Sequence, residues 1–110
     1  PESAARIMMA HALEPAGPLW RFRFDPGVQG AAAFRYTEDA VLAFLRQIAI
    51  PTLIVRGEHG HVPGPADAPD RYAALRFGQH TELAGAGHHV HVETPRELAE
   101  VLSAWWDSLP

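Results

Sequence analysis

The sequence predicts an α/β layered fold with parallel strands from residue 37 onwards. Apolar periodicity and turn residues follow one another there in the order helix, strand, loop, helix, strand, loop, helix. The run at 52–55, Thr-Leu-Ile-Val, has no polar alternation, which is typical of a parallel strand covered on both faces. Because two such strands leave unpaired edges and are marginal alone, we interpret the chain as one edge of a larger sheet.

The segment before residue 37 carries weaker patterns. Ala, Ile and Met at helical spacing predict a helix over 2–13, which Pro15 and the Gly and Pro after it end. Apolar residues alternate with arginine over 19–25, which predicts a short extended segment with one buried face. A Pro-Gly pair at 26–27 predicts a turn, and small residues predict a loop over 30–34. We interpret the aromatic side chains here as ordinary packing rather than as a pocket wall: Trp20, Phe22 and Phe24.

A helix is predicted from Thr37 to about residue 47. Thr37 is a favoured N-cap, and the two acidic residues after it suit the positive end of the helix dipole. Aliphatic residues at helical spacing should form its inner stripe: Val41, Leu42, Leu45 and Ile48. After the strand at 52–55, residues 56–65 predict a loop rich in Gly, His and Pro.

Two further helices are predicted in the C-terminal half. Asp67 is the expected N-cap of the first, with Pro69 in its first turn, and a weak strand over 81–84 follows it. The second begins in the sequence Thr-Pro-Arg-Glu, where Thr94 and Glu97 have the spacing of a capping box. Its apolar face should consist of Leu98, Val101, Leu102 and Trp105.

The composition excludes several classes of chemistry. The chain has no cysteine and no lysine, which excludes disulfides, thiolate metal sites, cysteine nucleophiles and Schiff-base chemistry. A formal charge of -4 argues against a nucleic-acid partner. No apolar run approaches the ~20 residues of a membrane span, and no secretory signal is present, so we expect a cytoplasmic protein without a membrane partner. Because the chain begins with Pro1 rather than Met, we expect a fragment or a processed product.

Two segments carry a family resemblance. Residues 51–58, Pro-Thr-Leu-Ile-Val-Arg-Gly-Glu, resemble the penultimate strand and following turn of the α/β-hydrolase superfamily. Residues 85–95, Gly-Ala-Gly-His-His-Val-His-Val-Glu-Thr-Pro, resemble its catalytic-histidine loop and the start of its last helix, in the serine-hydrolase-like branch. The resemblance implies that residues 1–35 are the tail of a cap or lid region. Residues 36–110 would be the C-terminal part of the hydrolase core, with the last two strands and their helices.

The resemblance also implies a chemistry. His88 matches the catalytic histidine, which serves as general base for a serine in a Gly-x-Ser-x-Gly turn far upstream. The chain has three serines, and none of them lies in such a motif: Ser3, Ser103 and Ser108. The chain alone is therefore expected to be inactive. In the complete protein we expect hydrolysis of a small molecule with an ester or similar acyl bond, without an organic cofactor. The expected partner is the missing N-terminal part or a second copy.

The catalytic acid is where the sequence departs from the family. The usual Asp lies three residues after the glycine that ends the strand, and Gly60 occupies that position here. Three explanations stay open: Glu58 substitutes for it, an acid after the preceding strand serves instead, or this protein is not a competent hydrolase. Two other acids fit helix capping better: Asp67 and Asp70.

The remaining histidines allow other interpretations. His89 and His91 would share one face of an extended segment, as pocket lining or as solvated loop residues, and Glu93 should support the turn before the last helix. A metal site is one alternative, if the two histidine-rich loops meet: His59, His61, His89 and His91, with Glu58 and Glu93. A non-catalytic interaction fragment is the other, with an apolar helix that carries Trp105 and Trp106.

Overall fold

The computed structural model describes residues 2–30, 32 and 34–110. The chain divides into two compact units, Pro1–Arg35 and Tyr36–Pro110. The predicted loop over 30–34 includes Ala31 and Ala33, which lie outside the described residues. Among the residues that the structure describes, none of the helices has both the length and the apolar character needed to cross a membrane.

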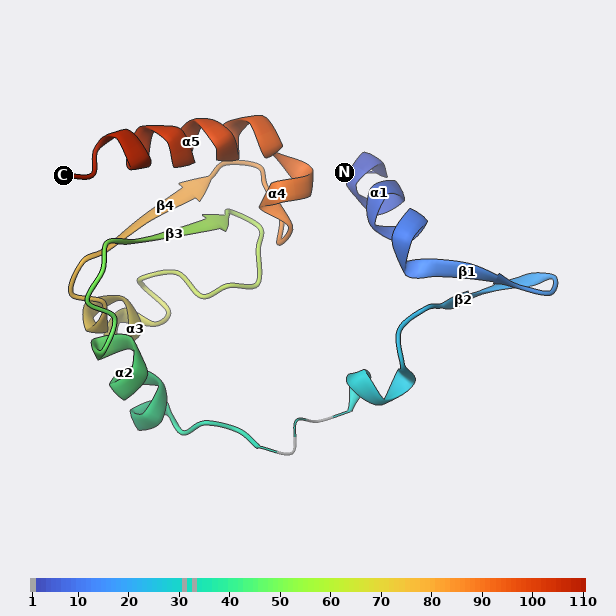
Figure 1. Cartoon of the computed structure of the whole chain (residues 1–110), viewed down its shortest axis with the longest axis horizontal. Coiled ribbons are helices and arrows are strands. Elements are labelled where there is room, and N and C mark those ends of the chain that lie inside the picture. Colours follow the sequence, from blue (N-terminus) through green and yellow to red (C-terminus); the bar gives the residue numbers. More distant parts are fainter. Residues whose placement is uncertain (1, 31, 33) are drawn as a thin grey trace. The chain divides into compact units, whose positions relative to one another are not determined.

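The first unit contains a helix and a β-hairpin (Figure 1). Helix α1 spans Glu2–Ala12, which confirms the predicted helix. Strands β1 (Leu13–Ala16) and β2 (Leu19–Phe22) pair antiparallel around a tight turn in which Gly17 has a φ of 64°. The prediction of one buried face was wrong, because all four residues of β2 are exposed. The predicted turn is a 3-10 helix, η1 (Pro26–Gln29).

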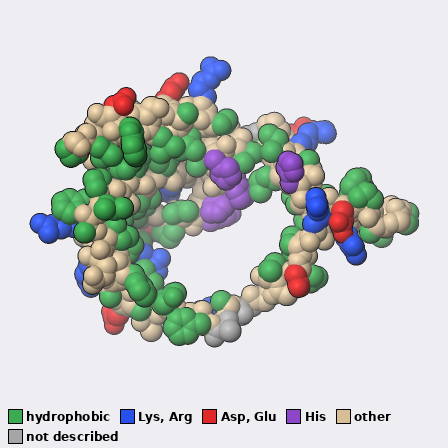
Figure 2. Space-filling model, viewed as in Figure 1, with side chains coloured by type: hydrophobic (Ala, Val, Ile, Leu, Met, Phe, Trp, Pro, Cys, Tyr) green, Lys and Arg blue, Asp and Glu red, His purple; other side chains and the backbone are tan. Residues whose placement is uncertain are grey.

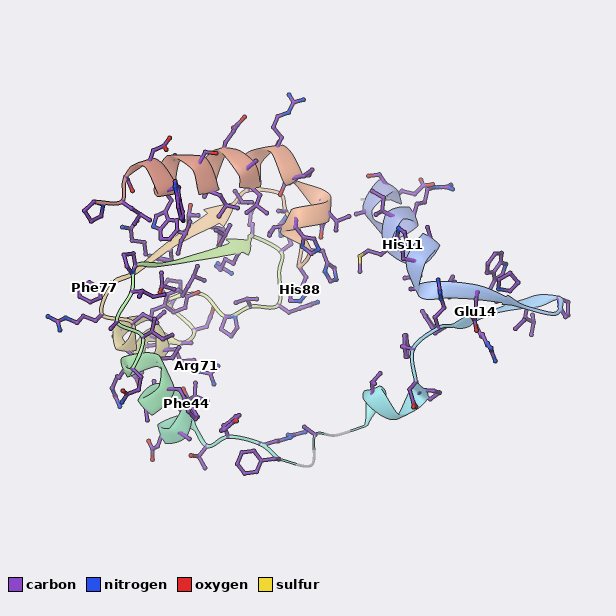
Figure 3. All side chains as sticks on the ribbon, in the orientation of Figure 1. His11, Glu14, Phe44, Arg71, Phe77 and His88 are labelled. Atoms are coloured by element: carbon purple, nitrogen blue, oxygen red, sulfur yellow. The ribbon has the colours of Figure 1, made fainter. Side chains whose placement is uncertain are left out.

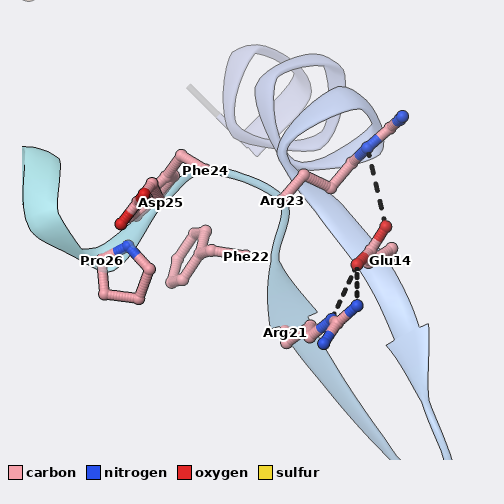
Figure 4. Close-up of a pocket in the computed structure, with 7 residues that line it drawn as sticks. All are labelled: Glu14, Arg21, Phe22, Arg23, Phe24, Asp25 and Pro26. Carbon is pink, nitrogen blue, oxygen red and sulfur yellow. Dashed lines mark hydrogen bonds and ion pairs between the residues drawn. The ribbon is translucent and has the colours of Figure 1, made fainter.

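A pocket lies beside this hairpin (Figure 4). The rings of Phe22 and Phe24 stack with centroids 4.8 Å apart, and Glu14 accepts a hydrogen bond of 2.7 Å from Arg21 and lies 4.0 Å from Arg23. The expectation of ordinary packing was wrong, because the aromatic side chains are solvent-accessible: Trp20 is 67% exposed, Phe22 49% and Phe24 39%. Phe22 and Phe24 form one wall of this pocket.

The second unit contains a pair of parallel strands. Helix α2 spans Glu38–Arg46, and the Thr37 hydroxyl accepts a hydrogen bond of 3.3 Å from the Ala40 N–H, as its capping role predicts. Strand β3 (Thr52–Gly57) pairs parallel with β4 (Gly78–Leu83), in a register that joins Gly57 to Leu83. The predicted order of helix, strand, helix, strand is therefore confirmed.

Helix α3 begins one residue later than predicted. It spans Pro69–Ala74, and its N-cap is Ala68, which makes no side-chain capping bond. The Asp67 carboxylate instead accepts a hydrogen bond of 3.1 Å from the Gly64 N–H. The prediction of Asp67 as N-cap was wrong because its side chain closes the turn before the helix.

The last two helices follow β4 with Thr94 between them. Helix α4 is a single turn (Val90–Glu93), and α5 spans Pro95–Asp107. The predicted capping box does not form, because the Thr94 hydroxyl donates to the Val90 carbonyl at 3.1 Å and makes no bond to the first turn of α5. The competing acceptor is the carbonyl of Val90, the first residue of α4. A threonine hydroxyl can reach the carbonyl four residues before it in the chain.

The core of this unit is thin. Helix α5 lies on one side of the two strands and helices α2 and α3 lie on the other (Figure 1). The buried apolar residues of this unit are few, and two of the five are alanines: Leu42, Ala74, Leu75, Leu83 and Ala86. Residues 52–56 of β3 are only half-buried. The strand is therefore not fully covered on both faces, contrary to the prediction from the sequence. Leu102, expected on the inner face of α5, is 44% exposed.

Candidate active site

The candidate site lies at the carboxyl ends of β3 and β4. Because the two strands are parallel, the loops that follow them leave from the same edge. Two backbone hydrogen bonds join these loops, from the Glu58 N–H to the Leu83 carbonyl at 3.1 Å and from the His59 N–H to the Ala86 carbonyl at 2.9 Å. His88 lies near the loop that follows β3 (Figure 3).

Gly57 is required where the two loops meet. A Cβ added there would lie 2.0 Å from the Gly87 carbonyl oxygen and 2.6 Å from that of Ala86. Distances this short do not occur for real side chains, so a larger residue would force the backbones apart. Gly85 has a φ of 69°, which favours glycine, whereas no pattern in the sequence indicated the close approach at Gly57.

Histidine rings gather at this edge (Figure 2). The His88 ring centroid is 5.5 Å from that of His61 and 5.0 Å from that of His89. His89 in turn lies 6.0 Å from His91, again between centroids. The structure therefore brings His61 beside the candidate base, whereas the sequence singled it out only as a possible metal ligand.

Glu58, the candidate acid, is bound to the backbone of the opposite loop. Its carboxylate accepts a hydrogen bond of 2.8 Å from the Gly85 N–H, and it lies 3.9 Å from the His59 ring. Within the described residues, no hydrogen bond or ion pair joins Glu58 to His88. A catalytic role for Glu58 therefore stays a prediction, while its structural role is to hold the two loops together.

Glu93 organises the turn that carries His88. Its half-buried carboxylate accepts hydrogen bonds from the Gly87 N–H at 2.9 Å and the His89 N–H at 3.0 Å. These two hydrogen bonds hold the pKa of the Glu93 carboxyl below its usual range, because they stabilise its charged form. The predicted supporting role of Glu93 is confirmed.

Residues 89–91 do not form the extended segment in which His89 and His91 would share one face. The Val92 and Glu93 N–H groups both donate to the His89 carbonyl at 2.9 Å, which starts the helical turn of α4 directly after the loop. Glu93 also binds the two amides that precede this turn, so the backbone N–H groups of the loop and the turn are paired. His89 and His91 come close to each other across the turn rather than on one face of a strand.

The metal-site alternative receives no support from the geometry. In the part of the chain that the structure describes, no three histidine, aspartate or glutamate side chains converge on a point where a metal ion could bind. The two loops do meet, as that alternative required, but the carboxylates of Glu58 and Glu93 are turned to backbone amides.

The carboxyls with lowered pKa predict an acid-sensitive fold. Hydrogen bonds and the charge of Arg71 lower the pKa of Glu38, as the loop amides lower that of Glu93. A lowered folded-state pKa contributes stability at higher pH that is lost as the pH falls through that pKa. We expect the urea concentration at the unfolding midpoint to decrease as the pH is lowered from about 6 to about 3. This decrease should be smaller in Glu93→Gln and in Glu38→Gln. An unchanged pH dependence in Glu93→Gln would contradict this assignment.

Comparison with known proteins identifies the fold. No family model and no curated protein sequence matches the chain. A solved CIB-like hydrolase from Thermoplasma acidophilum is 23% identical over 67% of this chain and 35% of its own length, with a TM-score of 0.56. The thioesterase domain from the curacin biosynthetic pathway is 18% identical over 94% of this chain and 42% of its own, with a TM-score of 0.71.

These matches confirm the fold inferred from the sequence. The chain has a mixed α/β structure that matches fragments of α/β-hydrolase folds. It spans less than half the length of either solved structure, namely 35% of one and 42% of the other.

Proposed function

We propose that this chain is the C-terminal portion of a hydrolase that acts on ester or similar acyl bonds, with His88 as its general base. One observation carries the proposal: His88 lies at the carboxyl edge of a parallel strand pair in an α/β-hydrolase fold. Its loop is held by the Glu93 carboxylate and the close contact at Gly57. Ligands of open α/β sheets bind at this edge, which is where a base must meet them.

The proposed reaction is an acyl transfer to serine followed by hydrolysis. The neutral imidazole of His88 takes the proton of a serine hydroxyl as that oxygen attacks the acyl carbon. The same proton then passes to the leaving group, and the cycle repeats with water. Glu58 is the candidate acid within this chain, and it would have to exchange the Gly85 N–H for His88 to serve directly.

The nucleophile is proposed to come from outside this chain. Ser103 lies within α5, and the Ser108 hydroxyl donates to the Trp105 carbonyl at 2.7 Å. Ser3 lies in α1, in the other compact unit. None of the three follows a strand in a tight turn, as an exposed nucleophile of this fold would.

The expected partner follows from the exposed surface. Large apolar side chains of the second unit are open to solvent: Phe44, Ile50, Phe77, Leu102 and Trp106. Each strand of the pair also has one edge without a neighbour in the described residues. We propose that the remaining part of the same protein, or a second copy of the chain, covers these surfaces.

The same surface favours a second candidate function, a non-catalytic interaction fragment. Trp106 is 71% exposed on α5, and large exposed aromatic side chains are typical of protein interfaces. A chain of this kind would keep the fold and bind its partner without using His88. The two functions differ in whether substitution of His88 affects the assembled protein's chemistry.

An assay of the isolated chain tests where the nucleophile lies. We expect turnover of a p-nitrophenyl acyl ester or an acyl thioester no faster than that given by free imidazole at the chain's histidine concentration, because no serine is placed to form the acyl intermediate. Ser103→Ala is the matched variant and should give the same rate. Clear turnover that Ser103→Ala abolishes would contradict the proposal, since the nucleophile would then lie inside the chain.

A further inference from the structure

Among the residues that the structure describes, no carboxylate is hydrogen-bonded to the ring of the proposed base, His88. A histidine that removes a proton with one ring nitrogen needs its other nitrogen held by a second group, which fixes the tautomer and the ring orientation. Three acidic side chains lie in or directly after the two loops, and each binds backbone N–H groups instead; Asp67 binds that of Gly64. Glu58 binds the Gly85 N–H, and Glu93 binds the Gly87 and His89 N–H groups.

The ring of His61 occupies the neighbourhood where such a partner is needed. We propose that His61 is a positioning residue that orients His88, an inference that rests on the proposed role of His88 as general base. The two rings are tilted by 41° with centroids 5.5 Å apart. A modest side-chain rotation at this separation brings one nitrogen of each ring within hydrogen-bond distance, and such bonds are often long before substrate binds.

His61 is presented by a loop with several fixed points. The Gly60 N–H donates to the Gly57 carbonyl at 2.9 Å, and Arg56 donates to the Val62 carbonyl at 3.4 Å while it pairs with Glu82 on β4. These bonds fix the backbone on both sides of His61.

Position 60 lies where the backbones of the two loops come close together. A Cβ on Gly60 would lie 3.1 Å from the Gly57 carbonyl oxygen and 3.6 Å from the His88 Cα. The backbone of the two loops is therefore already in contact where the family has its aspartate. The next residue, His61, is the one whose side chain reaches the His88 ring.

An imidazole can perform the orienting role without a net charge. One nitrogen of neutral His61 accepts a hydrogen bond from the His88 N–H that does not face the substrate. When His88 takes the serine proton, it becomes an imidazolium and that bond becomes charge-assisted. No proton moves to His61 in this step, and His88 returns its proton to the leaving group.

The test measures the tautomer of His88 by long-range ¹H–¹⁵N correlation in the ¹⁵N-labelled chain at about pH 8.5, where free imidazoles are neutral. In the unsubstituted chain we expect one tautomer to dominate. His61→Phe keeps an aromatic ring and removes both nitrogens, and it should change the tautomer ratio about two- to tenfold, the effect of one hydrogen bond. His61→Asn retains a donor and an acceptor and should restore the ratio.

Control variants separate this role from packing and from Glu58. His91→Ala should leave the His88 ratio unchanged, and the amide spectrum of β3 and β4 reports that each variant is folded. An unchanged ratio in His61→Phe, or a change that Glu58→Gln alone reproduces, would overturn the proposal. The readout needs no turnover, so a failure of the proposed hydrolase function would show in the kinetics and leave this result intact.

Discussion

Substitution of Gly57 by alanine is expected to disrupt the second unit by about 3 kcal/mol or more, because it overpacks two backbones that cannot easily part. The added Cβ would lie 2.0 Å from the Gly87 carbonyl oxygen and 2.6 Å from that of Ala86. Ala86 is fully buried, so the β4 side has little room to yield. Urea unfolding, followed by the exchange of the amide protons of β3 and β4, measures the loss.

Gly85→Ala is the matched control for this substitution. Gly85 lies in the same pair of loops, and no atom is within 4 Å of an added Cβ, so the cost comes only from its φ of 69°. That cost is about 1 kcal/mol. If Gly57→Ala proved no more destabilising than Gly85→Ala, the close contact between the loops would be wrong, and with it the placement of His88 beside His61.

Substitution of His88 is expected to have the largest effect on activity. In the product of the complete reading frame, which we propose contains the nucleophile, His88→Ala should lower kcat/KM for an acyl ester about a million-fold. The loss arises because the serine hydroxyl keeps its proton and is a poor nucleophile. His91→Ala should change kcat/KM less than about threefold, since the His91 ring lies beside His89 and not beside His88.

A stability measurement separates this chemical effect from unfolding. The His88 side chain is exposed, and its removal should change the free energy of unfolding by less than about 0.5 kcal/mol. Activity that survives His88→Ala would contradict its role as general base. An equal loss in His91→Ala would instead indicate that the histidine group acts through the structure of the loop.

Local sequence patterns were sufficient for most of the second unit. The aliphatic run at 52–55 and the cap at Thr37 depend on neighbouring residues, and both produced the elements that they predict. The alternation of helix and strand then sufficed to predict parallel pairing.

Competing local bonds defeated other predictions. Thr94 lies at the position of a capping residue in the sequence, but its hydroxyl donates to the Val90 carbonyl instead. Asp67 likewise had the position of an N-cap and bound Gly64 instead. In the first unit, β1 was not predicted because proline usually ends a helix or strand, and Pro15 lies within β1. An edge strand of a hairpin nevertheless tolerates a proline.

The contact between His61 and His88 could not be read from the sequence. It depends on the register of β3 against β4, which sets Gly57 opposite Leu83 and thereby brings two loops together. Neither loop alone carries a signal for the distance between two rings that are 27 positions apart in the sequence. The histidine-rich composition was visible, but it indicated His61 only as a possible metal ligand.

The central claim is that this chain supplies the base of a serine hydrolase whose nucleophile lies outside it. The most direct measurement is the coding sequence upstream of the codon for Pro1. We predict that this upstream sequence encodes, in the same reading frame, a Gly-x-Ser-x-Gly motif between a predicted strand and a predicted helix. A start codon immediately before Pro1, with no such motif, would contradict the claim and favour the interaction fragment.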